Sequence, residues 1–402
     1  PHSPFPIPHS PFPIPHSPFP ILMETKLGLV CRKCSYDANP VTATHCEICR
    51  HPLKQNISLN DRISKFRVKP PILWLGLALL LLFPMSRGLL FLMDRRSPDS
   101  TASSTASNNL SRSRGIQLYN SMREVQNVPE GLFNYSSAPQ FAALTSHGMN
   151  DAITQAHPKF RLRYAEPSNN IPGSSTVLAM LVSHLLSFGQ TARPIEAVEY
   201  SQAQQHNFTL EQIPIGFDGI AFYTHRDLTI AGLSINQLQN IFMGKVRNWK
   251  QVGGPDLPIV PISLNPETNS SIKYLFASIK GAKLGSNVQI VRDYTEQTRK
   301  VAANPGAISY GSMATTAAQK SIRPFGLARG SSNRYVQPFT PNRQINAEAI
   351  RDGSYPLTRR LFVVIRRDGL LDEQAGVAYA NLLLSTEGQR IIDKAGFVSI
   401  RQ

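Results

Sequence analysis

Residues 213–249 read IPIGFDGIAFYTHRDLTIAGLSINQLQNIFMGKVRNW. The stretch begins with an apolar, β-rich run that includes GIAFYTH, and it continues into INQLQNIFMGKV, where apolar residues recur with helical periodicity. The same alternation extends outward on both sides, with short runs such as LPIVPIS, AISYGS and RLFVVIRR and with a long helical segment at residues 374–396. Strands that alternate with helices predict an α/β domain with mainly parallel sheets.

This globular pattern spans residues 116–402, which is too long for one typical hydrophobic core, so we expect two lobes. The whole chain has 402 residues, of which 41% are hydrophobic and 17% are charged, as in ordinary globular proteins. Its formal net charge is +16. No nucleic-acid-binding motif accompanies the basic residues, so we expect no nucleic-acid partner.

The chain opens with the heptad PHSPFPI, which is written three times over residues 1–21. Proline at three of every seven positions forbids a helix and a packed core. We expect residues 1–22 to be extended or to reflect a wrongly assigned start, because Met23 opens a plausible N-terminus. A proline-rich ligand for aromatic grooves is the alternative.

The four cysteines lie in two motifs, CRKC and CEIC, which are separated by residues 35–45. Each CxxC turn can place two thiolates on one metal, and four sulfur ligands in a tetrahedron suit zinc. Residues 24–55 therefore resemble a zinc ribbon, in which Zn²⁺ is structural because no coordination position stays open. A rubredoxin-like iron site and two redox pairs are the alternatives. The expected metal ligands are Cys31, Cys34, Cys46 and Cys49.

Residues 71–93 are the stretch that could cross a bilayer, for which about 20 apolar residues are needed, although Pro84 and Arg87 interrupt it. A cleaved signal peptide is disfavoured because the segment begins far from the start of the chain, and a buried core helix is the other alternative. A basic cluster precedes the segment: Arg50, Lys54, Arg62, Lys65, Arg67 and Lys69. The positive-inside rule then predicts a single-pass protein of the inner (plasma) membrane, with a cytoplasmic N-terminus and an extracytoplasmic C-terminal domain. Residues 94–115, rich in Ser, Thr and Asn, are expected to be a flexible linker.

Three places in the globular region pair hydroxyl or amide side chains with the start of an expected helix. They are Ser136 and Ser137; Ser174, Ser175 and Thr176; and Asn269, Ser270 and Ser271. Each offers backbone N–H groups, the positive end of a helix dipole and polar side chains, a combination that binds anions. Ordinary N-capping is the alternative for each place. The pattern predicts an anion site only if the fold brings the three places together.

An ordered series of segments carries a resemblance to a known family. The segments are VPEGLFNYSSAPQFAAL, PGSSTVLAMLVSHLLSFGQTARPI, the stretch at 213–249, QVGGPDLPIVPISLNPETNSS, ANPGAISYGS and SYPLTRRLFVVI. In these segments the chain resembles the phosphate-binding protein of ABC-type phosphate importers. The resemblance implies a two-lobed periplasmic-binding-protein fold of type II, with lobe 1 at about residues 128–220 and 355–402 and lobe 2 at about residues 221–354. It also implies that the three helix starts line a hinged cleft that holds phosphate or a related oxyanion, and that an ABC permease is the partner.

The chain departs from the family's pattern at two ligand positions. Leu264 stands where the second lobe's anion loop commonly supplies an arginine, and Ala192 stands where many members carry an aspartate that accepts a phosphate proton. Arg193, beside Ala192, could supply charge instead. Asp218 is an acid flanked by apolar residues, and we expect it to have a structural role, by orienting an arginine or capping a turn.

No catalytic motif accompanies these sites. A GxSxG elbow, a GxxxxGKS/T loop and an HExxH site are all absent from the sequence, so we expect no enzyme. The leading hypothesis is a membrane-anchored solute-binding protein that closes its lobes around an oxyanion. The alternative is a sensor or scaffold whose degenerate binding domain works with the zinc ribbon and an unknown cytoplasmic partner.

Overall fold

The computed structural model describes residues 31, 39, 43–46, 48, 51–53, 115–167, 171–267 and 269–401. The proline-rich repeat, the apolar segment at 71–93, Cys34 and Cys49 lie outside the described residues, as does all of the expected linker except residue 115. Within the ranges that are described, no helix is both long enough and apolar enough to cross a membrane.

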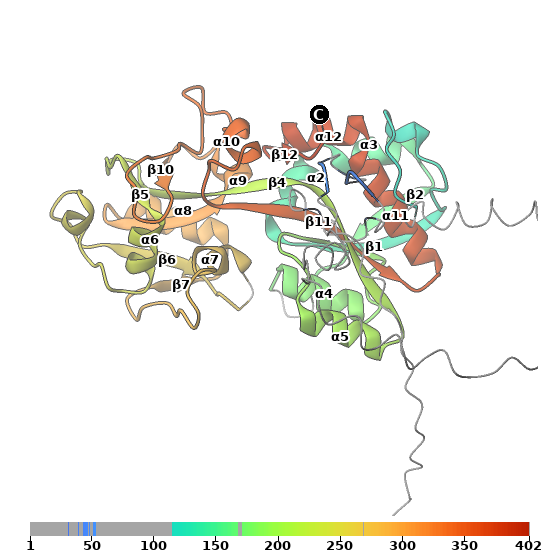
Figure 1. The fold of residues 1–402 in the computed structure, drawn as a ribbon, viewed down its shortest axis with the longest axis horizontal. Coiled ribbons are helices and arrows are strands. Elements are labelled where there is room, and N and C mark those ends of the chain that lie inside the picture. The colour runs from blue at the N-terminus through green and yellow to red at the C-terminus, as the bar shows by residue number, and fades with distance from the viewer. Residues whose placement is uncertain are drawn as a thin grey trace, which may run out of the picture.

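Two lobes that share two long strands make up the chain from residue 115 onward (Figure 1). Lobe 1 contains η3 (Met122–Glu124), β1 (Gly131–Ser137), η4 (Pro139–Phe141), α2 (Ala142–Ser146), α3 (Met149–Ala156), β2 (Phe160–Tyr164), α4 (Ser174–Val182), β3 (Phe188–Thr191), α5 (Ala197–Gln205), α11 (Leu371–Leu384), α12 (Thr386–Lys394) and β12 (Val398–Ser399). Lobe 2 contains β5 (Gly232–Ser234), α6 (Ile235–Phe242), η5 (Trp249–Val252), β6 (Val260–Leu264), α7 (Ser270–Leu275), β7 (Gln289–Val291), α8 (Tyr294–Ala303), β8 (Ala307–Ser312), α9 (Met313–Thr316), β9 (Ile322–Pro324), β10 (Gly326–Ala328) and α10 (Ala347–Arg351). The shared strands are β4 (Thr209–His225) and β11 (Thr358–Arg367).

Strand β4 runs through both lobes and is buried along nearly its whole length, as expected for a strand that is covered on both faces. Its first part pairs with β11, up to the pair Gly219–Thr358, and its second part pairs with β8, beginning at the pair Ile220–Ser312. The change of partner from β11 to β8 therefore marks the junction of the lobes.

Glycine is required at this junction. A Cβ added at Gly219 would overlap the thioether of Met313, the first residue of α9. The absence of a side chain lets α9 pack directly against the crossing strand where it passes from one lobe to the other.

The α/β class predicted by the alternation is confirmed, but the sheet is mixed and not mainly parallel. Within the lobes, β1 pairs in parallel with β2 and β3, and β6 pairs in parallel with β7 and β8. The antiparallel pairs all involve β4 or β11. These are the crossing strands, which run in opposite directions because the chain passes into lobe 2 on β4 and returns on β11.

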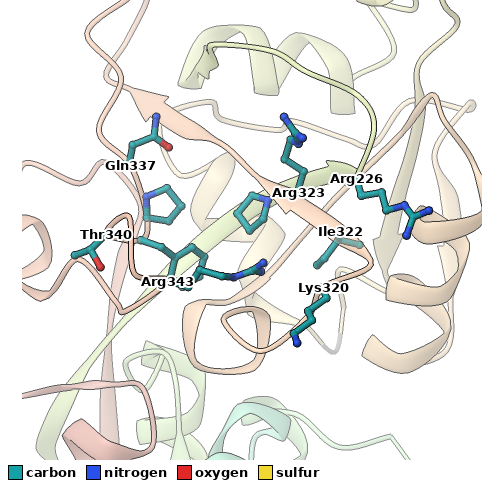
Figure 2. A pocket seen from close by; sticks show the side chains of 10 residues that line it. Arg226, Lys320, Ile322, Arg323, Gln337, Thr340 and Arg343 are labelled. Atoms are coloured by element: carbon teal, nitrogen blue, oxygen red, sulfur yellow. The ribbon is translucent and has the colours of Figure 1, made fainter.

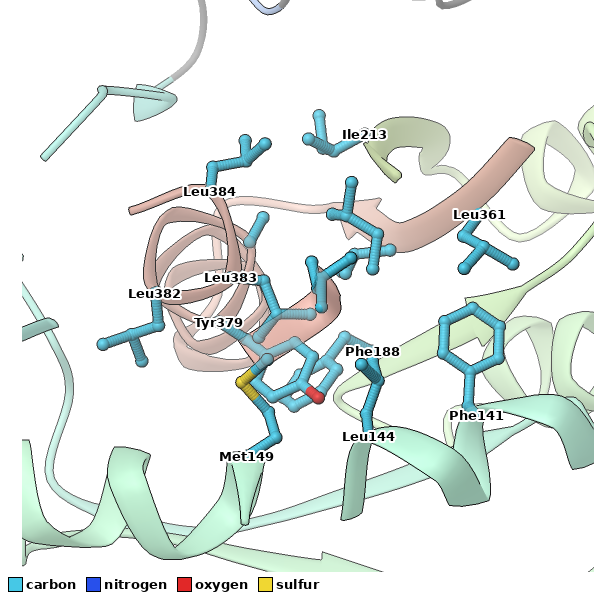
Figure 3. Packing of buried hydrophobic residues seen from close by; sticks show 14 of the residues in the cluster. Phe141, Leu144, Met149, Phe188, Ile213, Leu361, Tyr379, Leu382, Leu383 and Leu384 are labelled. Carbon is cyan, nitrogen blue, oxygen red and sulfur yellow. The ribbon is translucent and has the colours of Figure 1, made fainter. Parts of the chain in front are cut away.

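The hydrophobic cores follow the same division. In lobe 1, Phe188 of β3 stacks on Tyr379 of α11 with ring centroids 4.3 Å apart, and α2, α3 and β11 close the cluster around them (Figure 3). The main core of lobe 2 draws its buried residues from Ile220 to Leu357, with one addition, Val398. Lobe 1 is therefore built from two separated parts of the chain, whereas lobe 2 is one nearly continuous insertion.

Candidate functional site

The expected helix start at Ser174 forms the tip of α4 in lobe 1. Ser174 is buried, and its Oγ accepts a hydrogen bond of 3.1 Å from the backbone N–H of Ala192, the residue that follows β3. Thr176 turns outward and donates to the carbonyl oxygen of Ile171 at 2.9 Å. The α4 tip is thus fastened to the carboxyl end of β3 through Ser174.

Ser136 and Ser137 end β1, and the parallel register places them beside Gly189 and Gln190 of β3. The backbone N–H of Ala138 donates to the carbonyl oxygen of Gln190 at 3.0 Å, which holds the two strand ends together. Ser136 is fully buried, and its Oγ has no hydrogen-bond partner among the described residues. A buried hydroxyl without a partner is costly, so this atom is a candidate contact for a bound ligand.

Arg193 is already engaged by a carboxylate. Its guanidinium makes two hydrogen bonds to Glu199, at 2.6 and 2.9 Å, and a third to Ser175 Oγ at 2.9 Å. Burial acts to lower the pKa of Arg193, but the hydrogen bonds and the charge of Glu199 outweigh it and raise that pKa. The residue expected to supply charge is therefore cationic, and its charge is largely balanced within lobe 1.

In lobe 2, Asn269 caps the N-terminus of α7. Its Oδ1 accepts from the backbone N–H of Ser271 at 2.9 Å, and its Nδ2 donates to the hydroxyl of Tyr294 at 2.9 Å. Ser270 is the half-buried first residue of α7. Ser271 is buried, and its Oγ accepts a hydrogen bond of 2.8 Å from Nη1 of Arg359. The α7 tip is therefore tied to the crossing strand β11.

Arg359 belongs to a fully buried ion pair at the junction of the lobes. Its Nε and Nη2 donate to Asp218 Oδ2 at 2.9 and 2.7 Å, and Ser312 Oγ donates to Asp218 Oδ1 at 2.8 Å. The two side chains are 1% and 0% exposed. Although burial acts to lower it, the pKa of Arg359 is raised by the Asp218 charge, so the guanidinium stays protonated. Asp218 thus orients an arginine, one of the two structural roles expected from the sequence.

Tyr274 joins the lobes directly. Its hydroxyl, on α7 of lobe 2, donates to the carbonyl oxygen of Ala192 in lobe 1 at 3.2 Å. Because the N–H of Ala192 donates to Ser174, the first residue of α4 and Tyr274, near the C-terminal end of α7, contact the same residue. The β1 end lies beside the strand that Ala192 follows, so the ends of β1 and α4 and the Tyr274 side chain of α7 come together around Ala192.

Three arginine side chains lie close to Tyr274, and two of them are paired with carboxylates. Burial raises the pKa of the Tyr274 hydroxyl, while the nearby guanidiniums of Arg359, Arg360 and Arg193 act in the opposite direction. Ala192 and Leu264, at the two positions that depart from the family's pattern, are both buried. The guanidiniums near Tyr274 therefore come from β11 and from Arg193 after β3, and not from the loop that follows β6.

A cavity of about 660 Å³ opens beside this network. Pro139 of lobe 1 forms one wall, and Tyr294, Thr298 and Arg299 of α8 belong to the wall from lobe 2. Tyr294 also bonds Asn269, so the cavity adjoins the α7 tip. None of the expected site residues lines this cavity, which reaches the α7 tip through Tyr294.

Two of the four expected metal ligands are described. Cys31 and Cys46 are buried, and Cys34 and Cys49 lie outside the described residues. Across the ranges that the structure covers, no three His, Cys, Asp or Glu side chains come together as a metal site. Four thiolates on zinc remain the prediction for this segment.

Arg359, Tyr274 and Tyr294 were not identified from the sequence. Arg359 lies in SYPLTRRLFVVI, where a charged pair enters a run of strand-forming residues. An arginine inside a buried strand needs a counter-charge, and Asp218 in the other apolar strand was the available partner. That pairing was the signal that could have identified Arg359.

Comparison with known proteins places this architecture among binding domains. A family model described as a PBP superfamily domain matches residues 136–387. The chain is similar to the phosphate-binding protein PstS of Borreliella burgdorferi, at 23% identity over 272 residues, which covers 64% of this chain and 90% of that protein. It is similar to PstS of Pseudomonas aeruginosa at 24% identity over 243 residues, covering 57% of this chain and 72% of that one.

Two solved structures share the fold. One is a phosphate ABC transporter substrate-binding protein with bound phosphate from Clostridium perfringens, with a TM-score of 0.55, 23% identity and coverage of 67% of this chain and 99% of that one. The other is an ABC-type phosphate transport receptor from Vibrio cholerae, with a TM-score of 0.51, 18% identity and coverage of 66% and 99%. At these identities the likeness concerns the fold.

Proposed function

Since this chain belongs to the PBP superfamily, we propose that its interlobe crevice binds phosphate or a related oxyanion and that the protein is the solute-binding component of a phosphate-type ABC importer. The observation that carries the proposal is that the ends of β1 and α4 and the Tyr274 hydroxyl of α7 meet around Ala192, while Arg359 donates to Ser271 at the start of α7. The relatives whose names state phosphate binding support the choice of ligand.

The binding mechanism follows from the groups at the crevice. Ser136 Oγ is free to donate to an anion oxygen, and the first turn of α4 presents backbone N–H groups at the positive end of its dipole. Arg359 and Arg360 of β11 lie near Tyr274, with Arg359 paired to Asp218, and their net positive field would attract an anion. Bending of β4 and β11 would close the lobes over the ligand, and the Tyr274–Ala192 hydrogen bond would hold the closed arrangement.

The departures at Leu264 and Ala192 predict modest affinity and weak selectivity. A charge-assisted hydrogen bond contributes about 1.5–3 kcal/mol, so the missing arginine weakens binding by about one to two decades. Ala192 has no side-chain acceptor for the proton of a phosphate monoanion or dianion. We therefore expect phosphate and sulfate to bind with similar affinities.

The N-terminal segments complete the proposal. Residues 71–93 would anchor the chain in the membrane, with the binding domain outside and a four-cysteine zinc ribbon in the cytoplasm. An ABC permease would receive the ligand from the lobes, and an unknown cytoplasmic protein would bind the ribbon.

The second candidate function is a sensor or scaffold that binds no solute. The pairing of Arg193 with Glu199 and of Arg359 with Asp218 favours it, because both guanidiniums are already balanced by carboxylates. In that case the ectodomain would act through a protein partner and the zinc ribbon.

Calorimetric titration of the full chain with phosphate and with sulfate tests the proposal. The informative variant is Ser136→Ala: the serine Oγ makes no hydrogen bond within the described residues, so its removal should leave folding intact. We expect micromolar phosphate binding that weakens by about five- to tenfold or more in Ser136→Ala. The matched control is Ser201→Ala, on the exposed face of α5.

Absence of heat with both anions would reject the oxyanion proposal and favour the scaffold. An unchanged affinity in Ser136→Ala, with a fold that is intact by circular dichroism, would show that the β1 tip is not part of the site.

A further inference from the structure

Lobe 2 contains a second concave site. The segment 319–323 contributes residues both to this site and to the cavity that Tyr294 lines. The second site has a volume of about 330 Å³, and its walls come from the end of β4, from β9 with the residues before it, and from the loop at 337–343 (Figure 2). Four cationic side chains line it: Arg226, Lys320, Arg323 and Arg343. We call this site the basic pocket.

The charge in the basic pocket is one-sided. No carboxylate is among the residues that line it. The nearest recorded acid, Asp227, lies 3.6 Å from Arg226 and is 74% exposed, so it balances that residue only weakly. Arg323 donates to Thr229 Oγ1 at 3.1 Å, a neutral acceptor. All four cationic side chains are exposed, and a multivalent anion can contact several of them together.

Arg343 is held in an unusual backbone conformation. Its φ is +60°, in the left-handed region where glycine or asparagine is usual. The loop is closed by hydrogen bonds from Arg343 N–H to Thr340 O and from Thr340 N–H to Gln344 O, both 2.8 Å. The backbone of this turn does not itself need an arginine, and the guanidinium reaches outside the turn to the segment at Gln319.

That guanidinium lies across the pocket. Figure 2 shows the Arg343 side chain extended toward Ile322, with Lys320 below them and the Arg323 side chain directed away from Arg343. Its Nη2 donates to the carbonyl oxygen of Gln319 at 2.9 Å, which leaves further N–H groups for a ligand. The loop therefore bears backbone strain at the residue that places a cation in the middle of the site.

We propose that the basic pocket binds a small anion that carries two or more phosphate groups. Its cations come from three separate segments, so a ligand must span several charges to contact them together. Its volume falls in the range of small-molecule sites and exceeds the need of a single phosphate. The site is separate from the crevice and does not depend on the crevice binding a solute.

The test is calorimetric titration of the full chain with sodium tripolyphosphate, in low and in high salt. Arg343→Asn is the informative variant, because asparagine tolerates the left-handed conformation and the fold should be retained with an equal or higher Tm. Arg334→Asn is the matched control: it makes the same change of charge at an exposed position of the same lobe. We expect tripolyphosphate to bind more tightly than phosphate at this site, and Arg343→Asn to weaken it by about tenfold or more.

Three outcomes would overturn the proposal. The first is no binding of tripolyphosphate. The second is an equal loss in Arg343→Asn and Arg334→Asn, which would indicate a general charge effect. The third is loss of tripolyphosphate binding in Ser136→Ala but not in Arg343→Asn, which would place the ligand in the crevice. Co-sedimentation with vesicles of phosphatidylcholine and phosphatidylglycerol tests a lipid headgroup as the ligand. Vesicle binding that depends on Arg343, without tripolyphosphate binding, would assign the pocket to a lipid surface and reject the soluble ligand.

Discussion

Replacing Arg359 with methionine should destabilise the domain by about 3–5 kcal/mol. Methionine roughly preserves the volume of the side chain but removes two hydrogen bonds to Asp218 and one to Ser271. The Asp218 carboxylate, which is 0% exposed, then stays in the interior without a counter-charge. Most of the cost comes from that isolated charge and not from the lost attraction, because a buried pair also carries a large desolvation penalty.

The size of the effect can be separated into its parts with a double-mutant cycle. Asp218→Leu alone leaves Arg359 uncompensated and should cost about the same. The double variant Asp218→Leu/Arg359→Met has no buried charge at these two positions, and its free energy of unfolding should lie within about 1 kcal/mol of that of the natural chain. The coupling free energy between the two positions should therefore be several kcal/mol, well above the value for separate sites.

Urea unfolding followed by circular dichroism measures all four corners of the cycle, with Arg334→Met as an exposed control. Additive losses in the double variant would refute the reasoning, as would a loss below about 1 kcal/mol in Arg359→Met. The phosphate affinity of Arg359→Met is a separate readout, and it should fall because the variant also releases Ser271 at the α7 tip.

Three further predictions concern other parts of the chain. Tyr274→Phe removes the hydroxyl that donates to Ala192, so the ratio of open to closed molecules should rise by about two- to tenfold. The distance distribution between spin labels on the two lobes measures this ratio, and an unchanged distribution would contradict the prediction. The pKa of Asp293, the N-cap of α8, is lowered, chiefly by the hydrogen bond from the backbone N–H of Glu296. The ionised cap therefore stabilises the fold fully above the ordinary carboxylate pKa near 4, and this stabilisation is lost as the pH falls through the lowered pKa. Asp293→Ala should therefore cost about 1 kcal/mol at neutral pH and little near pH 2, and an equal loss at both pH values in urea unfolding would oppose this account. The full chain should carry one zinc ion by elemental analysis, and Cys31→Ser should lose it; iron in place of zinc would argue for the rubredoxin-like alternative.

The general architecture was accessible from sequence because it depends on local patterns. Apolar runs such as residues 219–225 and the helical periodicity of residues 235–246 fix which segments become strands and helices. The direction of the strands was not accessible in the same way. It depends on β4 and β11 crossing between the lobes in opposite directions, a relation between segments more than a hundred residues apart.

The residues of the candidate site were predictable from the sequence only where the signal is local. Ser174 and Asn269 could be picked out because hydroxyl and amide residues at helix starts are recognisable from adjacent residues. Arg193 was considered as a source of charge, but its engagement depends on Glu199, which lies one helical turn into the next element. Tyr274 and Arg359 escaped notice because their partners in the crevice are distant along the chain.

The continuous insertion of lobe 2 has a consequence for biosynthesis. The core of lobe 1 needs residues from both Phe133 and Phe397, so it cannot be completed until the ribosome has passed Phe397. The lobe 2 core lies almost wholly between Ile220 and Leu357, so it can form earlier during synthesis. At that stage the first part of lobe 1 has been synthesised but cannot complete its core. A premature stop after lobe 2 would therefore leave the second lobe nearly complete and the first without its central helix α11.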